Sequence, residues 1–241
     1  MAPATASEFA CAPLFKVART GKLRRVHPTH LPLTAGESIL IGLVVAVVVL
    51  VPLLGLPAAH FSGMTREGAH ALLARILGLS VAEIILDRHS GGRTSIVGEG
   101  LRVAFVFLLG YVGPSLFGLG AARLISLGYA VAVLWLLVVL LVGVLFTLGR
   151  SFGLISVPFA LAALYVILRN GHVRTEVIAA YAVAWLLLLS GLRTVIAHGA
   201  HSGATDNMRS HTHLPHGLWW LLWLAGTVAA LLLGGKLLVL G

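Results

Sequence analysis

The sequence predicts an all-α integral membrane protein with six or seven transmembrane helices. Three observations predict this class: 59% of the 241 residues are hydrophobic, only 10% are charged, and long apolar runs recur along the chain. A water-soluble domain carries charges at about a quarter of its positions, so the composition excludes one. The formal net charge of +9 does not indicate nucleic-acid binding, because the basic residues are scattered between apolar runs and form no stripe.

The chain begins with a basic segment that precedes the first apolar run. Its basic residues are Lys16, Arg19, Lys22, Arg24 and Arg25. Because Lys and Arg are enriched on the cytoplasmic side of membrane proteins, residues 1–36 are predicted to be a cytoplasmic tail. Residues 37–241 are then one polytopic membrane domain in the cell (plasma) membrane, with the amino terminus in the cytoplasm.

The predicted spans are the apolar runs that contain no Asp, Glu, Lys or Arg. A crossing helix needs about 20 apolar residues, because every backbone amide must be satisfied inside the hydrocarbon. A shorter run from Val177 to Leu192 is the sixth candidate, and Gly149 and Arg150 indicate a tight helical hairpin between two spans. The five longer runs are Ser38–Leu56, Val103–Ala122, Leu124–Gly149, Ser151–Leu168 and Gly217–Gly235.

The stretch after the first span differs, because it carries charges among its leucines and alanines. Charged side chains in membranes usually face protein or a wet cavity, so residues 64–79 are predicted to be a helix packed among the others. After Gly78, apolar alternation followed by Gly91 and Gly92 predicts a short β-hairpin. The number of spans depends on this helix. The bias of Lys and Arg favours seven spans with residues 64–79 crossing, whereas six spans place the loop 193–216 on the same side as His70.

The residues most able to carry chemistry lie in this helix, where positions 66–70 read Arg-Glu-Gly-Ala-His. Residues 66 and 70 are one helical turn apart, the spacing by which zinc metalloproteases present two imidazoles to the metal while the glutamate between them activates water. Here the first position is Arg66. A guanidinium stays protonated and has no lone pair to offer a cation.

The motif and its surroundings resemble the site-2 protease family of intramembrane zinc metallopeptidases over roughly residues 38–240. More narrowly, they look like its bacterial M-50-type, B-like branch, and the Ala-, Leu-, Val-, Gly- and Arg-rich composition is compatible with a bacterial source. The resemblance rests on residues 66–70 and on the order of five further segments. These are Ala71-Leu72-Leu73-Ala74, Gly91-Gly92-Arg93-Thr94, Gly110-Tyr111-Val112-Gly113-Pro114, Arg150-Ser151-Phe152-Gly153 and Thr212-His213-Leu214-Pro215.

The resemblance implies a zinc ion held by both motif histidines and a distal aspartate, with the glutamate as general base. Carried over, the base falls on Glu67 and the ligands on His70 and Asp206, with Ala204 as the alternative register for the distal position. Arg66 departs from the pattern and implies that zinc has been lost, unless His60 or His89 replaces the missing ligand.

Three interpretations of this motif stay open. The first is that Arg66 and Glu67 form an ion pair that satisfies itself. The second, compatible with the first, is a metallopeptidase relative with a degraded active site, a pseudoprotease that binds membrane segments or partners. The third is an active intramembrane zinc protease with a replacement ligand. The partners expected are the lipid bilayer and a membrane-protein substrate or partner segment, and no nucleic acid.

A histidine-rich segment before the last span offers a different function, a metal sensor or transporter. Imidazoles suit zinc, copper or nickel, whereas the alternative is a polar loop with interfacial histidines. Two further patterns are interpreted as structural. Trp219, Trp220 and Trp223 are predicted to form an aromatic belt at the membrane interface, and the glycines from Gly110 to Gly120 a face that lets helices pack closely. The histidines of the segment are His198, His201, His211, His213 and His216.

Overall fold

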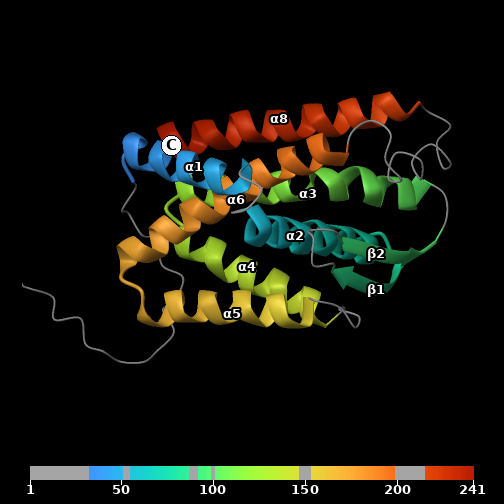
Figure 1. The fold of residues 1–241 in the computed structure, drawn as a ribbon, viewed down its shortest axis with the longest axis horizontal. Helices are drawn as coiled ribbons and strands as arrows, with labels where there is room; N and C mark the ends of the chain where they lie inside the picture. Colours follow the sequence, from blue (N-terminus) through green and yellow to red (C-terminus); the bar gives the residue numbers. More distant parts are fainter. Residues whose placement is uncertain (1–32, 51–54, 87–91, 99–100, 147–152, 199–214) are drawn as a thin grey trace, which may run out of the picture.

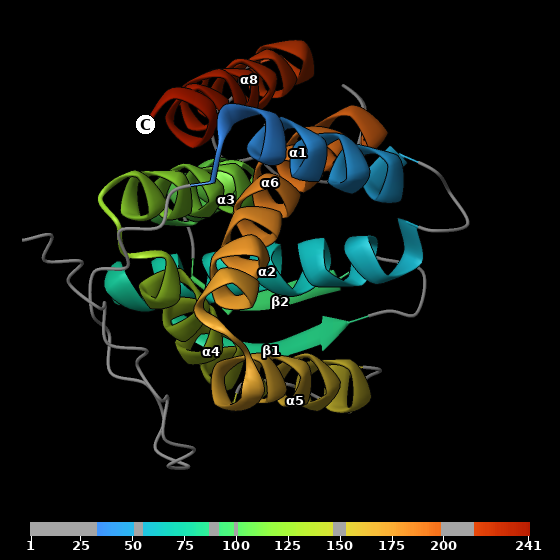
Figure 2. The ribbon, with the colours of Figure 1, turned by 90° about the vertical axis from the view of Figure 1, so that its left-hand side faces the viewer.

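The computed structural model describes residues 33–50, 55–86, 92–98, 101–146, 153–198 and 215–241. These residues form a helical bundle with one β-hairpin, drawn in Figures 1 and 2. The mostly helical class and the short hairpin after the motif helix are confirmed. In the described part of the chain the elements are α1 (Ala35–Leu50), α2 (Gly55–Ile76), β1 (Ser80–Leu86), β2 (Gly92–Val97), α3 (Leu101–Ser126), α4 (Ala130–Leu145), α5 (Gly153–Asn170), α6 (Val173–His198) and α8 (His216–Leu240).

Membrane association is supported by the apolar helices of the bundle. Among the described residues, α3, α6 and α8 are long and apolar enough to cross a bilayer, and α1, α4 and α5 are shorter apolar helices. The number of crossings, six or seven, stays a prediction.

One helix boundary differs from the sequence prediction. The apolar runs predict a break at Arg123, whereas α3 continues to Ser126. The chain reverses at Gly128, which has a φ of 85° in the left-handed region that glycine adopts without strain. The Tyr129 N–H then donates to the Leu124 carbonyl at 2.8 Å, so the turn satisfies an orphan carbonyl of α3 before α4 begins.

The motif helix α2 lies inside the bundle. It contacts α1, α3, α4, α6 and both strands, and Figure 2 shows it between the α1 side and the α5 side. Every residue from Gly63 to Ala71 is buried. The helix ends two residues before Gly78, whose φ is 73°. The predicted packing of this charged helix among the others is therefore confirmed, although α2 begins at Gly55 and not near residue 64.

The hairpin places β2 beside α2. Its strands are antiparallel, with Ile84 paired to Thr94 and an irregular register between Val81 and Glu83. Ile84 and Thr94 are both buried, and both strands contact α2. A polar threonine is thereby held against the motif helix.

Two of the predicted small residues bring helices close together. A Cβ on Gly113 of α3 would lie 2.5 Å from the Cβ of Ala69 in α2. A Cβ on Gly118 would lie 2.8 Å from the backbone nitrogen of Leu188 in α6. These distances are shorter than any normal carbon contact, so glycine at both positions sets how closely α3 packs on its neighbours.

Candidate functional site

The three motif residues are all buried on α2. Arg66, Glu67 and His70 are 5%, 2% and 4% exposed. Charged groups are rarely buried to this degree without partners, because leaving water costs them several kcal/mol each. The partners of these three side chains therefore decide what the site can do.

Arg66 forms an ion pair with the neighbouring Glu67. Its Nε lies 2.9 Å and its Nη2 2.8 Å from the same carboxylate oxygen, Oε1. The guanidinium carbon also lies 5.6 Å from the ring centroid of Tyr111 in α3, within the range of a cation–π contact. At the position where the motif calls for a metal-binding imidazole, this chain thus holds a cation that neutralises the glutamate.

The second oxygen of Glu67 is held from the hairpin. Thr94 Oγ donates a hydrogen bond to Glu67 Oε2 at 2.6 Å, across 27 residues of sequence. His70 Nδ1 lies 3.5 Å from the same Oε2. Each carboxylate oxygen therefore has a partner from the protein, and the carboxylate is fixed between α2 and β2.

His70 is packed by aromatic rings and by a glycine. Its ring lies edge-on to Phe107 and Tyr111, at centroid distances of 5.5 Å and 5.6 Å. A Cβ on Gly110 would lie 1.9 Å from the His70 Cδ2, so the imidazole occupies the space that a side chain there would fill. Neither ring nitrogen has a hydrogen-bond partner among the described residues. In the described part of the chain, His70 is thus positioned by the packing of its ring and by its 3.5 Å approach to Glu67.

The donors among the described residues do not match those of a catalytic zinc site. Such a site has three protein ligands with lone pairs, plus water. Arg66 has no lone pair and is bound to Glu67. In the described part of the chain, no three His, Cys, Asp or Glu side chains gather in a way that could hold a metal. His70 remains the motif's one imidazole donor.

Several predicted site residues lie outside the described residues. They comprise the distal ligand candidate, one replacement ligand and most of the histidine-rich segment, and the side chains of His60 and His198 are also not described. His216 is the first residue of α8. The undescribed residues are Asp206, Ala204, His89, His201, His211 and His213. Their roles stay predictions.

The structure adds residues that the sequence did not single out as functional. Thr94 was part of a turn motif, and Gly110 part of a packing face. Trp223, predicted to belong to an aromatic belt, is 1% exposed and stacks on Tyr111 with centroids 4.4 Å apart; the position of the belt at the membrane interface stays a prediction. Trp223 faces α3 because the two helices pack together. For Thr94, the sequence held one indication of its role: a hydroxyl in an apolar strand needs a hydrogen-bond partner.

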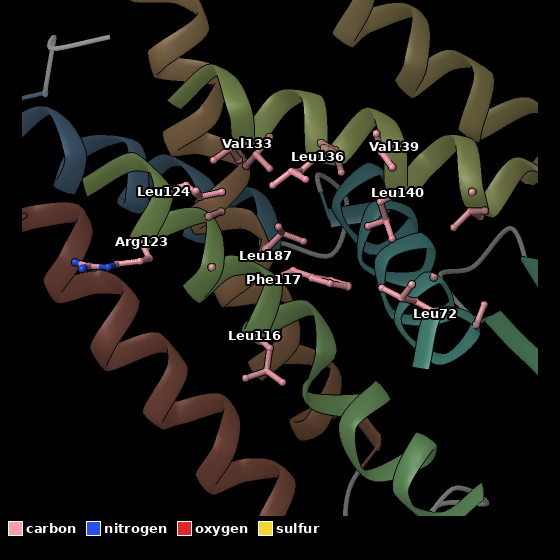
Figure 3. Close-up of a pocket in the computed structure, with 18 of the residues that line it drawn as sticks. Leu72, Leu116, Phe117, Arg123, Leu124, Val133, Leu136, Val139, Leu140 and Leu187 are labelled. Atoms are coloured by element: carbon pink, nitrogen blue, oxygen red, sulfur yellow. The ribbon is translucent and has the colours of Figure 1, made fainter. Parts of the chain in front are cut away.

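A different face of α2 borders an open apolar groove. The groove has a volume of about 920 Å³ and lies between α2, α3 and α4. Figure 3 shows apolar side chains around it, among them Leu72, Phe117 and Leu140. From α2 it is lined by Gly68, Ala71, Leu72 and Arg75, but by neither Glu67 nor His70.

Comparison with known proteins identifies one family. The model of the family described as Peptidase M50B-like matches residues 39–234, which is most of the chain. No curated protein and no solved structure matches the chain significantly.

Proposed function

The chain belongs to the Peptidase M50B-like family, a site-2 protease-like family, and from that premise we propose that it is a pseudoprotease. In this proposal it has lost zinc and peptide hydrolysis and acts by binding membrane segments or partner proteins. The matched region contains the motif helix, the hairpin and all the described apolar helices except the ends of α1 and α8.

The observation that carries the proposal is the ion pair between Arg66 and Glu67, at 2.8 Å. A permanently charged guanidinium cannot donate electrons to a metal, and it repels a divalent cation from the same place. It also supplies the positive charge that the buried carboxylate requires. The negative charge of Glu67 is therefore balanced by Arg66, without a metal ion.

The state of Glu67 gives further support. A general base must lie within hydrogen-bond reach of the water that it activates. Here Arg66 and Thr94 hold the two carboxylate oxygens at 2.8 Å and 2.6 Å. The open groove does not include Glu67 among its lining residues. A peptide in that groove would lie beside α2 without facing the base.

We also propose how the chain is oriented in the membrane with which its apolar helices associate. Residues 1–36 are a basic cytoplasmic tail, the amino terminus lies in the cytoplasm, and the protein resides in the plasma membrane of a bacterium. The excess of basic residues before the first apolar run supports this orientation. Six or seven crossings follow from whether α2 crosses or only enters the bilayer.

A cleavage assay tests the loss of hydrolysis. The full chain, reconstituted in phosphatidylcholine vesicles with added zinc, is given a quenched fluorescent apolar peptide of about 20 residues, long enough to span the bilayer. The matched control is the double variant Arg66→Met/Glu67→Gln, which removes the base and both buried charges together. We expect equal, background signals from the two proteins. Zinc-dependent cleavage by the wild type alone would overturn the proposal and favour an active protease with a replacement ligand.

A further inference from the structure

The apolar groove beside α2 has the length of a helix-docking surface. Its wall on α4 runs from Val133 to Phe146, which at 1.5 Å per residue is about 20 Å. The hydrocarbon core of a bilayer is about 30 Å thick, so one leaflet contributes about 15 Å. The groove is therefore longer than the hydrocarbon of one leaflet is thick and about two-thirds as long as a crossing helix.

The floor of the groove leaves room for a helix to approach. Among the described residues, a Cβ added at Gly120 of α3 or at Gly143 of α4 would meet no atom within 4 Å. In that part of the chain both positions have room for a side chain, in contrast to Gly113 and Gly118. Between membrane helices, small residues allow close backbone approach.

The charges along the groove indicate which helix would fit. Among the described residues, Arg75 and Arg123 are the charged residues that line the groove, and none of the lining residues is acidic. Neither guanidinium has an acidic partner among the described residues. Figure 3 shows Arg123 pointing away from the apolar side chains. Arg75 lies in the last turn of α2, where a partner's carboxylate at the end of a docked helix would complement it.

The groove lies on the side of α2 turned away from His70. At 100° per residue, the exposed Leu72 projects about 160° from His70 and about 140° from Glu67 around the helix axis. A helix docked against Leu72 would therefore not be presented to Glu67 and His70. Its binding would be that of a partner and not that of a substrate.

We propose that this groove docks one apolar transmembrane helix of a partner protein, with an Asp or Glu near the helix end that meets Arg75. This inference rests on the proposed function, because it assigns the place and the chemistry of the partner that a pseudoprotease would bind. The acidic group pairs with Arg75, and the apolar face of the helix covers the open glycines Gly120 and Gly143.

The probe is a labelled Leu/Ala helix of about 20 residues with one Glu near one end, long enough to cross the bilayer. Energy transfer to the labelled full chain is measured in phosphatidylcholine vesicles. Filling the groove with Gly143→Leu should weaken binding about tenfold, or about 1.4 kcal/mol. Gly217→Leu, at an equally open glycine outside the groove, should have no effect.

The charge is tested by a second matched pair. Arg75→Ala should weaken binding of the Glu-bearing probe about three- to fivefold, the scale of an exposed ion pair, and should not affect a probe without Glu. Arg123→Ala should change neither. Absence of wild-type binding, or equal binding by all variants, would overturn the inference. So would a result in which Gly143→Leu displaces only co-purifying phospholipid, because the groove would then be a lipid site.

These outcomes are separable from the proposed function. A protein that neither cleaves the apolar peptide nor binds the Glu-bearing probe would leave the loss of hydrolysis standing and would contradict the docking inference alone. A protein that binds the probe in the groove and also cleaves peptides with zinc would leave the docking groove standing and would contradict the loss of hydrolysis.

Discussion

The motif face and the groove face of α2 differ in almost every physical respect, although they share one helix. On the motif face, Arg66, Glu67 and His70 are charged or polar and at most 5% exposed. On the groove face, Leu72 is 45% exposed and its neighbours across the groove are apolar. The three motif residues are thus buried, whereas the described groove residue Leu72 is exposed and apolar.

Under the proposed function, the motif face serves the fold and the groove face binds the partner. A buried ion pair is weak evidence for net stabilisation, but removing one partner from it is strongly destabilising. Substitutions on the motif face should therefore unfold the protein, whereas substitutions at exposed residues of the groove face, such as Leu72, should change binding and leave the fold intact. The predictions below test this division in order of expected effect.

The largest effect is expected at Glu67. Glu67→Gln removes the charge that Arg66 Nε and Nη2 both contact. We expect a loss of about 3–5 kcal/mol in the free energy of unfolding, because a buried cation loses its counter-charge. Thermal unfolding in detergent measures it.

The double variant Arg66→Met/Glu67→Gln is the control for this prediction. It removes both charges and should recover most of the loss, since an apolar side chain can fill the place of a buried ion pair. If Glu67→Gln alone were as stable as the wild type, the pair would not be holding the core together.

The next effect is expected at Thr94, which joins the hairpin to the motif. Thr94→Val keeps the shape of the side chain and removes the donor to Glu67 Oε2. We expect a loss of about 1.5–3 kcal/mol, the range for a hydrogen bond to a charged group. Thr94→Ser, which retains the hydroxyl, should restore much of it. Equal stability of the valine and serine variants would argue against the bond.

Gly110 tests the shape of the His70 pocket. In Gly110→Ala the new Cβ would lie 1.9 Å from His70 Cδ2, so the ring must shift. We expect a destabilisation of about 1–3 kcal/mol, as for overpacking in other cores. Gly120→Ala on the same helix adds a Cβ that meets no atom of the described residues within 4 Å and should be tolerated. The free energies of unfolding of the two variants are compared by denaturant unfolding. Indistinguishable values would contradict the predicted contact between the new Cβ and His70.

The smallest effect is expected on the groove face. Leu72→Ala removes a side chain that is 45% exposed, and its stability should stay within about 0.5 kcal/mol of the wild type. Leu134→Ala in the core, where the side chain is fully buried, should cost about 2–5 kcal/mol. A large loss of stability in Leu72→Ala would show that the groove is part of the core and not a free surface.

Much of the fold is predictable from local sequence, because length, apolar composition and glycines determine where membrane helices run and end. The hairpin followed from apolar alternation and the glycines at 91 and 92. The break between α3 and α4 was misplaced, since Arg123 interrupts the apolar run but the helix continues to Ser126, and the reversal depends on the left-handed conformation of Gly128. Composition carries no information about such a single backbone angle.

The candidate site was predictable only in part. The motif spacing singled out Glu67 and His70, and the chemistry of guanidinium made Arg66 incompatible with a metal. The bond from Thr94 and the stacking of Trp223 on Tyr111 join segments far apart in sequence. Local sequence patterns do not predict contacts between such distant residues. Trp223 was therefore assigned to the membrane interface on its residue type alone.

The most direct test of the central claim is the zinc content of the full-length protein, purified without chelators, compared with that of His70→Ala. If Arg66 supplies the charge that a metal would otherwise bring, the wild type should contain no zinc that the His70→Ala variant lacks. Metal held by His211 and His213 would remain in both proteins and would not affect the comparison. About one tightly held zinc per chain, present in the wild type and lost in His70→Ala, would contradict the account.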